Sequence, residues 1–236
     1  MKKPIVDVLQ QYLPMSIRLE LSEQLGKAGK EGITLLGTLA ERFSGECYDV
    51  PVRLSKGQQV AVKTFKKTKS PARIQKEASL QQLCALADVS PVVYGVDTEN
   101  KHIVMAKLAS LPVETYSEGT LPDELQYQIC ALMHRMDNAK VMHADMNARN
   151  VMLNHAGRPY MIDFGFAKKI DTKIIRKFGQ HPNVKVTLWG LVRGFRRSHV
   201  QCDIMDACVK AQEKSCFFER GEALLSVRQT RKKRKR

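Results

Sequence analysis

Two neighbouring stretches of sequence decide the fold: Val141-Met-His-Ala-Asp-Met-Asn-Ala-Arg-Asn-Val-Met-Leu153 and, shortly after, Tyr160-Met-Ile-Asp-Phe-Gly165. They place Asp145, Asn150 and Asp163 at loop positions. Carboxylate and carboxamide oxygens are hard ligands of the kind that Mg²⁺ takes, and one carboxylate is left to receive a proton. This cluster therefore predicts a site at which a cation assists chemistry on phosphate.

Two short apolar runs accompany these polar residues. Val151–Leu153 and Tyr160–Ile162 flank Asn154 to Pro159, a segment rich in turn-forming residues. We predict a tight hairpin here. His143 stands at the start of the preceding loop, and we expect it to be structural, packing under the loop and bonding to the backbone.

Upstream, Val60-Ala-Val-Lys63 predicts a strand in which one lysine follows apolar residues. Ser70 and Pro71 next provide an N-cap and an N1 proline for a helix that ends near Leu86. Glu77 lies on the charged side of that helix. A single Lys or Glu is generally solvated, so it is their order relative to the downstream loop that marks them as functional candidates.

In this order the residues resemble the protein kinase superfamily. Val60-Ala-Val-Lys63 is similar to its third-strand lysine motif, His143 to Asn150 is similar to its H-R-D-x-x-x-x-N catalytic loop, and Asp163-Phe-Gly165 is its D-F-G. The resemblance extends from Ile33 to about Lys169, and three motifs in the right order make it specific.

The resemblance implies a role for each motif residue. Lys63 would hold the α- and β-phosphates of ATP and would be fixed by an ion pair with Glu77. Asn150 and Asp163 would hold Mg²⁺ across the phosphates. Asp145 would orient the attacking hydroxyl and take its proton.

The resemblance also implies an adenine site and a phosphate loop. Ala61 and the segment from Met105 to Leu108 would enclose the adenine. The sequence contains no G-x-G-x-x-G, and Gly37 is the best candidate for its first glycine. Cradling of the phosphates by backbone N–H groups is therefore expected to be altered.

Three departures from the family pattern concern regulation. Ala144 replaces the Arg of H-R-D, no A-P-E follows D-F-G, and only 71 residues follow Gly165. They imply activity without activation-loop phosphorylation and a cut-down helical lobe. In these respects the chain resembles compact viral kinases, bacterial effector kinases and the small kinase of the KEOPS tRNA-modification complex.

The expected activity is transfer of the γ-phosphate of ATP to a Ser or Thr hydroxyl of a protein. Asn147 stands where Ser/Thr kinases often have Lys, so a Tyr acceptor stays open. A small-molecule phosphotransferase of the same fold and a pseudokinase that serves as a binding module also stay open. D-F-G favours the protein kinase over the phosphotransferase, and retention of every catalytic side chain argues against the pseudokinase.

We expect an α+β, two-lobed protein-kinase-like fold with a reduced C-terminal lobe. In chain order the expected units are an N-terminal helical extension over 1–30, an N-lobe over 31–108, a reduced C-lobe over 109–227 and a disordered basic tail over 228–236. The helical spacing of the extension continues through Ile17, Leu21 and Leu25.

The N-lobe is expected to hold five strands, the first three as an antiparallel meander: Ile33–Leu39, Cys47–Leu54, Gln59–Phe65, Pro91–Val96 and His102–Leu108. In the C-lobe, Thr120-x-x-Asp123 resembles a capping box that starts a helix. Further helices are expected around Asn183 to Phe195, Val200 to Cys216 and Phe218 to Val227.

Charge is concentrated at one end of the chain. The 236 residues have a net charge of +15, and seven of the basic side chains lie between Arg228 and Arg236, which leaves the body at about +8. Three interpretations of this tail remain: a signal for a nuclear-import receptor, a contact for an anionic partner such as nucleic acid or acidic lipid, or a solvated terminus with no role.

The cysteines and the apolar segments of the sequence indicate in which cellular compartment the protein is expected. Six cysteines form no C-x-x-C pair, which favours buried free thiols in a reducing compartment. The sequence shows no apolar signal segment and no 18-residue apolar window, so neither conventional secretion nor a membrane span is expected. We expect a cytoplasmic or nuclear protein, with delivery into a host cell left open.

Overall fold

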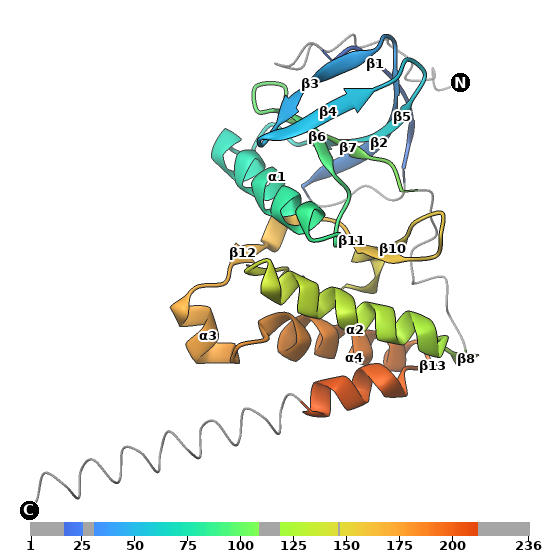
Figure 1. Cartoon of the computed structure of the whole chain (residues 1–236), viewed down its shortest axis with the longest axis vertical. Helices are drawn as coiled ribbons and strands as arrows, with labels where there is room; N and C mark the ends of the chain where they lie inside the picture. Colours follow the sequence, from blue (N-terminus) through green and yellow to red (C-terminus); the bar gives the residue numbers. More distant parts are fainter. Residues whose placement is uncertain (1–16, 26–30, 109–118, 146, 212–236) are drawn as a thin grey trace, which may run out of the picture.

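The structure is a computed structural model of the chain that describes residues 17–25, 31–108, 119–145 and 147–211. A lobe built mainly of strands lies above a lobe built mainly of helices (Figure 1). The upper lobe contains a five-stranded antiparallel sheet with the order β1-β2-β5-β7-β6. Its strands are β1 (Leu19–Gln24), β2 (Gly32–Leu39), β5 (Gln59–Phe65), β7 (His102–Ala106) and β6 (Val93–Asp97).

The edge strand β1 corrects the prediction of a helical extension to residue 30. Leu19 pairs with Leu39 of β2, and Leu21 pairs with Gly37. Ile17, Leu19 and Leu21 alternate with polar residues, so the period-two pattern competes with the helical spacing of Ile17, Leu21 and Leu25. Pairing with β2 decides the competition, because it satisfies the backbone of both strands. The helix expected over 1–16 lies outside the described residues.

A separate hairpin stands beside this sheet. It consists of β3 (Phe43–Cys47) and β4 (Val50–Leu54), joined by the two-residue turn Tyr48-Asp49. Both turn residues have positive φ, 52° and 60°, as the mirror-image turns of tight hairpins require. The predicted single strand Cys47–Leu54 is therefore wrong, and so is the meander, because β2 pairs directly with β5.

Helix α1 (Pro71–Leu86) lies between β5 and β6 in the chain, within the predicted bounds. Pro71 occupies its first turn and Ser70 is the N-cap residue, although the Ser70 side chain makes no cap hydrogen bond. Ile74 and Ala78 pack into the apolar core of the upper lobe, whereas Leu80 and Cys84 pack into the core of the lower lobe. One helix thus belongs to both cores.

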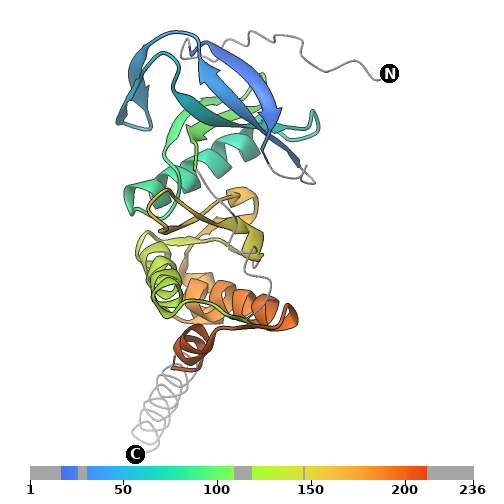
Figure 2. The same ribbon diagram turned by 90° about the vertical axis from the view of Figure 1, so that its right-hand side faces the viewer.

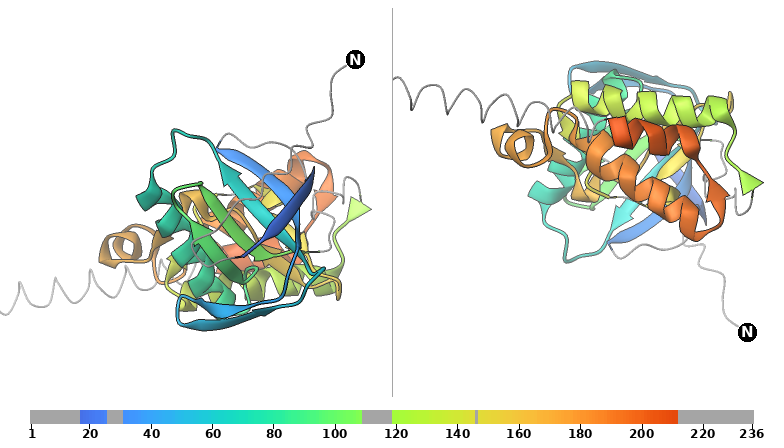
Figure 3. Two further views of the ribbon diagram at one scale, coloured as in Figure 1. Left: turned by 90° about the horizontal axis from the view of Figure 1, so that it is seen from above. Right: turned by 90° about the horizontal axis from the view of Figure 1, so that it is seen from below.

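The lower lobe is assembled on α2 (Asp123–Asn138). Its N-cap is Pro122, and Thr120 lies in the short strand β8 (Gly119–Thr120), so the predicted capping box is wrong. Below it a π-helical segment (Asn183–Leu188) runs into α4 (Trp189–Arg197), as the predicted helix over 183–195 requires (Figure 3, right). The parallel bridge of β8 with β13 (Val200–Gln201) ties this end of the lobe together.

The remaining lower-lobe elements surround the loops that carry polar residues. The predicted hairpin is present as β10 (Val151–Leu153) and β11 (Pro159–Met161), next to a bridge between β9 (Val141–Met142) and β12 (Lys168–Lys169). Two 3₁₀ turns (Ala148–Asn150 and Phe164–Phe166) flank the hairpin, and α3 (Thr172–Phe178), which the sequence patterns did not predict, follows β12.

The last described residues, 203–211, are helical, so the helix predicted from Val200 begins three residues later. The helix predicted over Phe218–Val227 and the tail from Arg228 to Arg236 lie outside the described residues. Five of the cysteines are described as free thiols, four of them buried and Cys208 half-buried. Within the described part of the chain, no helix has the length and apolar character needed to cross a membrane.

The lobes meet along α1 and the hairpin (Figure 2). The carbonyl of Val89, just after α1, accepts a hydrogen bond of 2.8 Å from the Met161 amide of β11. The Asp88 carboxylate also contacts the Arg158 guanidinium and the Tyr160 hydroxyl. Because α1 shares its buried face with both cores, its position relative to β10 and β11 is closely determined.

Candidate active site

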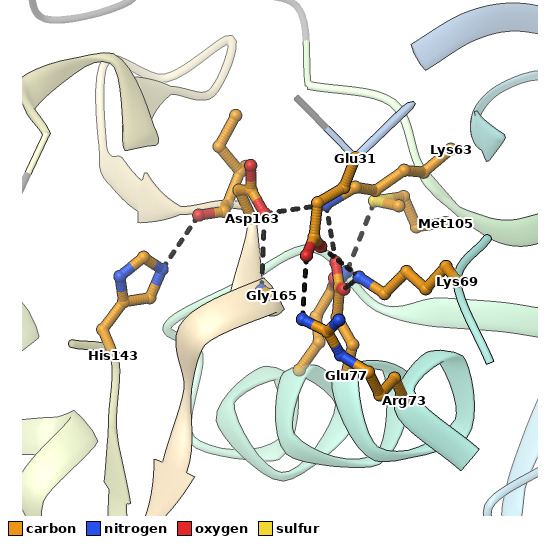
Figure 4. A network of polar contacts seen from close by, with 11 residues as sticks. Glu31, Lys63, Lys69, Arg73, Glu77, Met105, His143, Asp163 and Gly165 are labelled. Carbon is orange, nitrogen blue, oxygen red and sulfur yellow. Dashed lines mark hydrogen bonds and ion pairs between the residues drawn. The ribbon is translucent and has the colours of Figure 1, made fainter. Parts of the chain in front are cut away.

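Three charged residues from three elements meet between the lobes (Figure 4). Lys63 projects from β5, Glu77 from the second turn of α1, and Asp163 follows β11. The Lys63 Nζ lies 2.6 Å from Glu77 Oε1 and 2.8 Å from Asp163 Oδ1. The structure therefore brings together three residues that are up to 100 positions apart in sequence.

Burial strengthens the electrostatic interactions among these three charged residues. The Lys63 and Glu77 side chains are 12% and 2% exposed, whereas Asp163 is 48% exposed and opens toward solvent. Burial by itself lowers the pKa of Lys63, but the carboxylates of Glu77 and Asp163 outweigh it and the pKa is raised. Burial by itself raises the pKa of the Asp163 carboxyl, but the charge of Lys63 and its hydrogen bond outweigh burial, and the pKa is lowered. Both groups therefore remain charged at neutral pH.

A second lysine joins the cluster. The Lys69 Nζ lies 2.6 Å from Glu77 Oε2 and also contacts the carboxylate of Glu31, whose other oxygen is 2.9 Å from Arg73 Nη2. Lys69 is 5% exposed and its ammonium stands 4.3 Å from the centre of the Phe65 ring. Glu77 thus holds two buried ammonium groups, one on each carboxylate oxygen.

Sequence reasoning missed Lys69 and Glu31. Lys69 is one of four lysines between positions 63 and 69, and its residue type alone does not distinguish it from Lys66 and Lys67. Glu31 is the first residue of the predicted N-lobe and belongs to no motif. The available signal was the position of Lys69 directly before the helix cap, eight residues before Glu77.

Carboxylate oxygens lie close to Gly165, the glycine of D-F-G. A Cβ added to Gly165 would lie 3.1 Å from Glu31 Oε2 and 3.2 Å from Asp163 Oδ1. The Gly165 amide donates a hydrogen bond of 3.3 Å to Asp163 Oδ1. A side chain here would press on the oxygens that face Lys63 and Lys69, so glycine leaves this part of the site accessible.

His143 joins the loop of Asp145 to the strand that precedes Asp163. Its Nδ1 lies 3.1 Å from the Asp145 carbonyl oxygen and its Nε2 lies 2.9 Å from the Ile162 carbonyl oxygen. The ring is fully buried and packs edge-on against Phe164, with centroids 4.9 Å apart. Burial is the largest influence on the pKa of His143 and lowers it, although the hydrogen bonds to the two carbonyl oxygens act to raise it. The expected structural role of His143 is confirmed.

Two loop residues have a left-handed backbone. Ala144 has φ 62° and Asp163 has φ 62° and ψ 73°. This region costs a non-glycine residue roughly 1 kcal/mol or more, so the surrounding structure must hold these residues in place. Asn183 provides part of that support, because its Oδ1 accepts a 2.9 Å hydrogen bond from the His143 amide.

Asn183 is itself held by a buried carboxylate. Its Nδ2 donates to Asp137 Oδ1 at 2.7 Å and to the Val141 carbonyl at 2.7 Å. Burial raises the pKa of Asp137 to about 6, against the hydrogen bonds from Asn183. Sequence reasoning missed this pair because both residues lie on helices without a recognisable motif. Together they anchor the catalytic-loop segment to the base of the lower lobe.

The predicted magnesium ligands are arranged on either side of the hairpin. Asn150 is 7% exposed, and its carbonyl accepts a 2.9 Å hydrogen bond from the Ile162 amide, next to Asp163. Its buried Nδ2 has no hydrogen-bond partner among the described residues. One carboxylate and one carboxamide fit Mg²⁺, which takes one or two such ligands and completes its shell with phosphates and water. The described residues contain no cluster of three or more His, Cys, Asp or Glu that could hold a metal without a nucleotide.

The predicted adenine-site residues lie on neighbouring strands. Ala61 of β5 pairs with Met105 of β7, and both are nearly buried, at 8% and 7%. The Met105 sulfur is 3.4 Å from Gln81 Nε2 of α1. Leu108 lies two residues after β7 and is the last described residue before 109–118. Ala61 therefore lies on the same strand as Lys63, and Met105 lies directly across from Ala61.

Gly37 does not occupy a phosphate loop. It lies within β2, paired with Val60 on one side and Leu21 on the other, and a Cβ there would meet both Val60 and Val62 within 3.1 Å. The interpretation of Gly37 as the first glycine is therefore wrong. The first two strands of the sheet are separated by residues 25–31, of which 26–30 lie outside the described residues.

Comparison with protein families agrees with this geometry. The model for the protein kinase domain matches residues 43–189, which is more than half of the chain and includes every motif residue of the site. The chain therefore belongs to the protein kinase family, and its α+β architecture is a kinase fold. Comparison with curated proteins finds no match.

Proposed function

We propose that this protein is an ATP- and Mg²⁺-dependent protein kinase that phosphorylates Ser or Thr hydroxyls of proteins. The observation that carries the proposal is the contact of Lys63 with both Glu77 and Asp163. A charged lysine fixed on two sides presents its ammonium at one defined point, which is what stabilisation of transferred phosphate requires.

The other residues supply positioning. Asn150 and Asp163 would hold the metal, which when bound neutralises phosphate charge. Asp145 would orient the acceptor hydroxyl and take its proton, and His143 would keep the Asp145 loop in register with Asp163 through the two carbonyl contacts. Gly37 has no phosphate-loop role in this proposal, because it lies within β2.

Activity without activation-loop phosphorylation belongs to the same proposal. Ala144 stands where the family has the arginine that would bind such a phosphate. The Lys63–Glu77 pair is formed in the unmodified chain, and Lys69 holds the second oxygen of Glu77. The unmodified chain therefore already has the ion pair that phosphorylation would otherwise promote.

The test is incorporation of label from γ-labelled ATP into the protein itself and into a cell lysate. We expect labelling by the wild type, at least about a hundredfold less labelling by Lys63→Met and by Asp145→Ala, and full labelling by the exposed-site control Lys56→Met. Equal labelling by all four proteins would contradict the proposal. Phosphoamino-acid analysis then distinguishes Ser or Thr from Tyr, and a screen of small alcohols tests for a small-molecule phosphotransferase.

We also propose that the basic tail, Arg228 to Arg236, directs the protein to the nucleus through an import receptor. The support is its seven basic residues without an acid. Fusion of the full chain and of a chain ending at Val227 to a fluorescent protein tests it. Nuclear enrichment should depend on the tail, and equal distribution of the two fusions would contradict the proposal.

A further inference from the structure

Residues of α1, β12 and α3 line a groove that shares no lining residue with the candidate active site. Figure 1 shows α1 in the upper lobe and β12 and α3 in the lower lobe. It has a volume of about 580 Å³. Five lysines line it: Lys76 from α1, Lys168 and Lys169 from β12, and Lys173 and Lys177 from α3. One groove between the two lobes therefore gathers five ammonium groups.

This charge is not compensated within the groove. The lining contains one acidic residue, Asp171, whose Oδ1 accepts a 2.8 Å hydrogen bond from the Ile174 amide and caps α3. Among the described residues, none of the five lysines forms an ion pair with a carboxylate. Gathering like charges raises their mutual repulsion, which an anionic occupant would relieve.

The same surface exposes apolar side chains. Lys76, Ser79 and Leu83 follow each other at helical spacings of three and four and so share one face of α1. Leu83 is 38% exposed and Leu86, one turn further along, is 67% exposed. Ile174 and Phe178 add apolar surface from α3.

We propose that this groove binds an acidic segment of a partner protein, with carboxylates on the lysines and apolar side chains against α1. The apolar contribution favours a protein over a nucleic acid. Single-stranded nucleic acid would need aromatic platforms, and the groove offers only Phe178, which already has the Lys177 ammonium 4.9 Å from its ring centre.

The lower wall of the groove tolerates substitution. No residue of α3 is buried, and the helix is held by the Asp171 cap at its start and by Gly179 at its end. Lys173 and Lys177 can therefore be changed without disturbing either core. Arg53 of β4 and Lys56 in the turn after it are exposed on the upper lobe and provide a matched pair of basic residues outside the groove.

The test is fluorescence anisotropy with a labelled peptide of alternating Glu-Glu and Leu-Leu pairs, measured on the full chain without ATP. We expect the double variant Lys173→Glu/Lys177→Glu to bind about tenfold more weakly than the wild type, which corresponds to ~1.4 kcal/mol. The control Arg53→Glu/Lys56→Glu has the same net charge and should bind like the wild type. Equal weakening by both pairs, or no weakening by the groove pair, overturns the proposal.

Two further arms identify the occupant and exclude the tail. Leu83→Asn should weaken binding of the Glu/Leu peptide but not of an all-Glu peptide, which reports the apolar contact. A chain ending at Val227 should still lose affinity when the groove lysines are reversed. If the groove pair lowers affinity for a single-stranded RNA but not for the peptide, the site is a nucleic-acid site and the proposal is wrong. Because no ATP is present, these results are independent of the proposed kinase activity.

Discussion

At the scale of single residues, the site depends on how many partners each buried charge has. Glu77 is 2% exposed and accepts Lys63 on one oxygen and Lys69 on the other. Burying a charge is costly unless it is paired, and here each ammonium has two carboxylates within contact. Lys69 therefore acts as a positioning residue for Glu77, and through it for Lys63.

The first prediction removes that lysine. Lys69→Met should lower the free energy of unfolding by about 3 kcal/mol, because the buried Glu77 oxygen and Glu31 lose their common cation. The double variant Lys69→Met/Glu31→Gln should lose less than the two single changes together, since one unpaired carboxylate is removed. Urea denaturation measures all three. A loss below about 0.5 kcal/mol for Lys69→Met would show that its ammonium is solvated.

The second prediction concerns pH. His102 is 3% exposed, neither ring nitrogen has a hydrogen-bond partner among the described residues, and burial lowers its pKa despite the nearby Asp97. The unfolded chain takes up this proton near the ordinary value of 6.5, whereas the folded protein does so only at lower pH. Its contribution to stability is thus present above pH 6.5 and is lost as the pH falls.

The variant His102→Leu isolates this contribution. We expect the melting temperature of the wild type to fall more between about pH 7 and about pH 5 than that of His102→Leu, measured by calorimetry in the same buffers. His143 and Asp137 titrate in both proteins, so their contributions cancel in the comparison. Parallel melting curves at the two pH values would show that His102 keeps the same pKa on folding.

At the scale of elements, β2 is an inner strand of the sheet that its neighbours constrain on both sides. It pairs with β1 on one side and with β5 on the other. A Cβ added to Gly32 would stand 2.0 Å from the Thr64 carbonyl oxygen of β5, so this glycine is required by close approach of the two backbones.

The third prediction compares two glycines. Gly32→Ala should lower the free energy of unfolding by about 3 kcal/mol, because β2 must move away from β5 or twist. Gly194→Ala in α4 should raise it by about 0.5 to 1 kcal/mol, because no atom beyond the helix's own backbone lies within 4 Å of the added carbon and alanine favours helix. Chemical denaturation of both variants is the measurement. A similar change for both would contradict the close approach at Gly32.

The helices and strands also show where the local sequence pattern predicts secondary structure correctly and where it does not. α1 and the β10–β11 hairpin match their predictions, because each combines a periodic apolar run with a recognisable start or turn. The pattern fails at β1, where helical and alternating spacings coincide, and at Tyr48-Asp49, where a turn without glycine separates two strands. In both cases hydrogen bonding to another strand decides the structure, and such pairing is not encoded locally.

At the scale of the whole molecule, two apolar cores are joined by α1 and by the charged contact of Lys63 with Asp163. A ligand held from both lobes would stabilise the molecule as one unit. ATP would do so, since Lys63 belongs to the upper lobe and Asn150 and Asp163 belong to the lower one.

The fourth prediction follows from this arrangement. Mg²⁺ with ATP at about a hundred times its dissociation constant should stabilise the protein by roughly 2.7 kcal/mol and raise its melting temperature by several degrees. Mg²⁺ alone should have little effect, and Lys63→Met and Asp163→Ala should reduce the shift. Differential scanning fluorimetry provides the measurement. An unchanged melting temperature with Mg²⁺ and ATP would support a binding module that no longer handles nucleotide.

The sequence by itself determined the class of the protein. Lys63, Asp145, Asn150 and Asp163 lie in short motifs whose order and residue types predict a phosphate site, because ligand chemistry restricts which side chains can serve. Tertiary structure decided which polar groups act together: Lys69 rather than its neighbouring lysines, Glu31 beside Gly165, and the Asn183 carboxamide beneath His143. It also gathered the five groove lysines from two lobes. The physical reason is that pairing and repulsion of charges depend on distance in space, and these residues come from elements far apart in the chain.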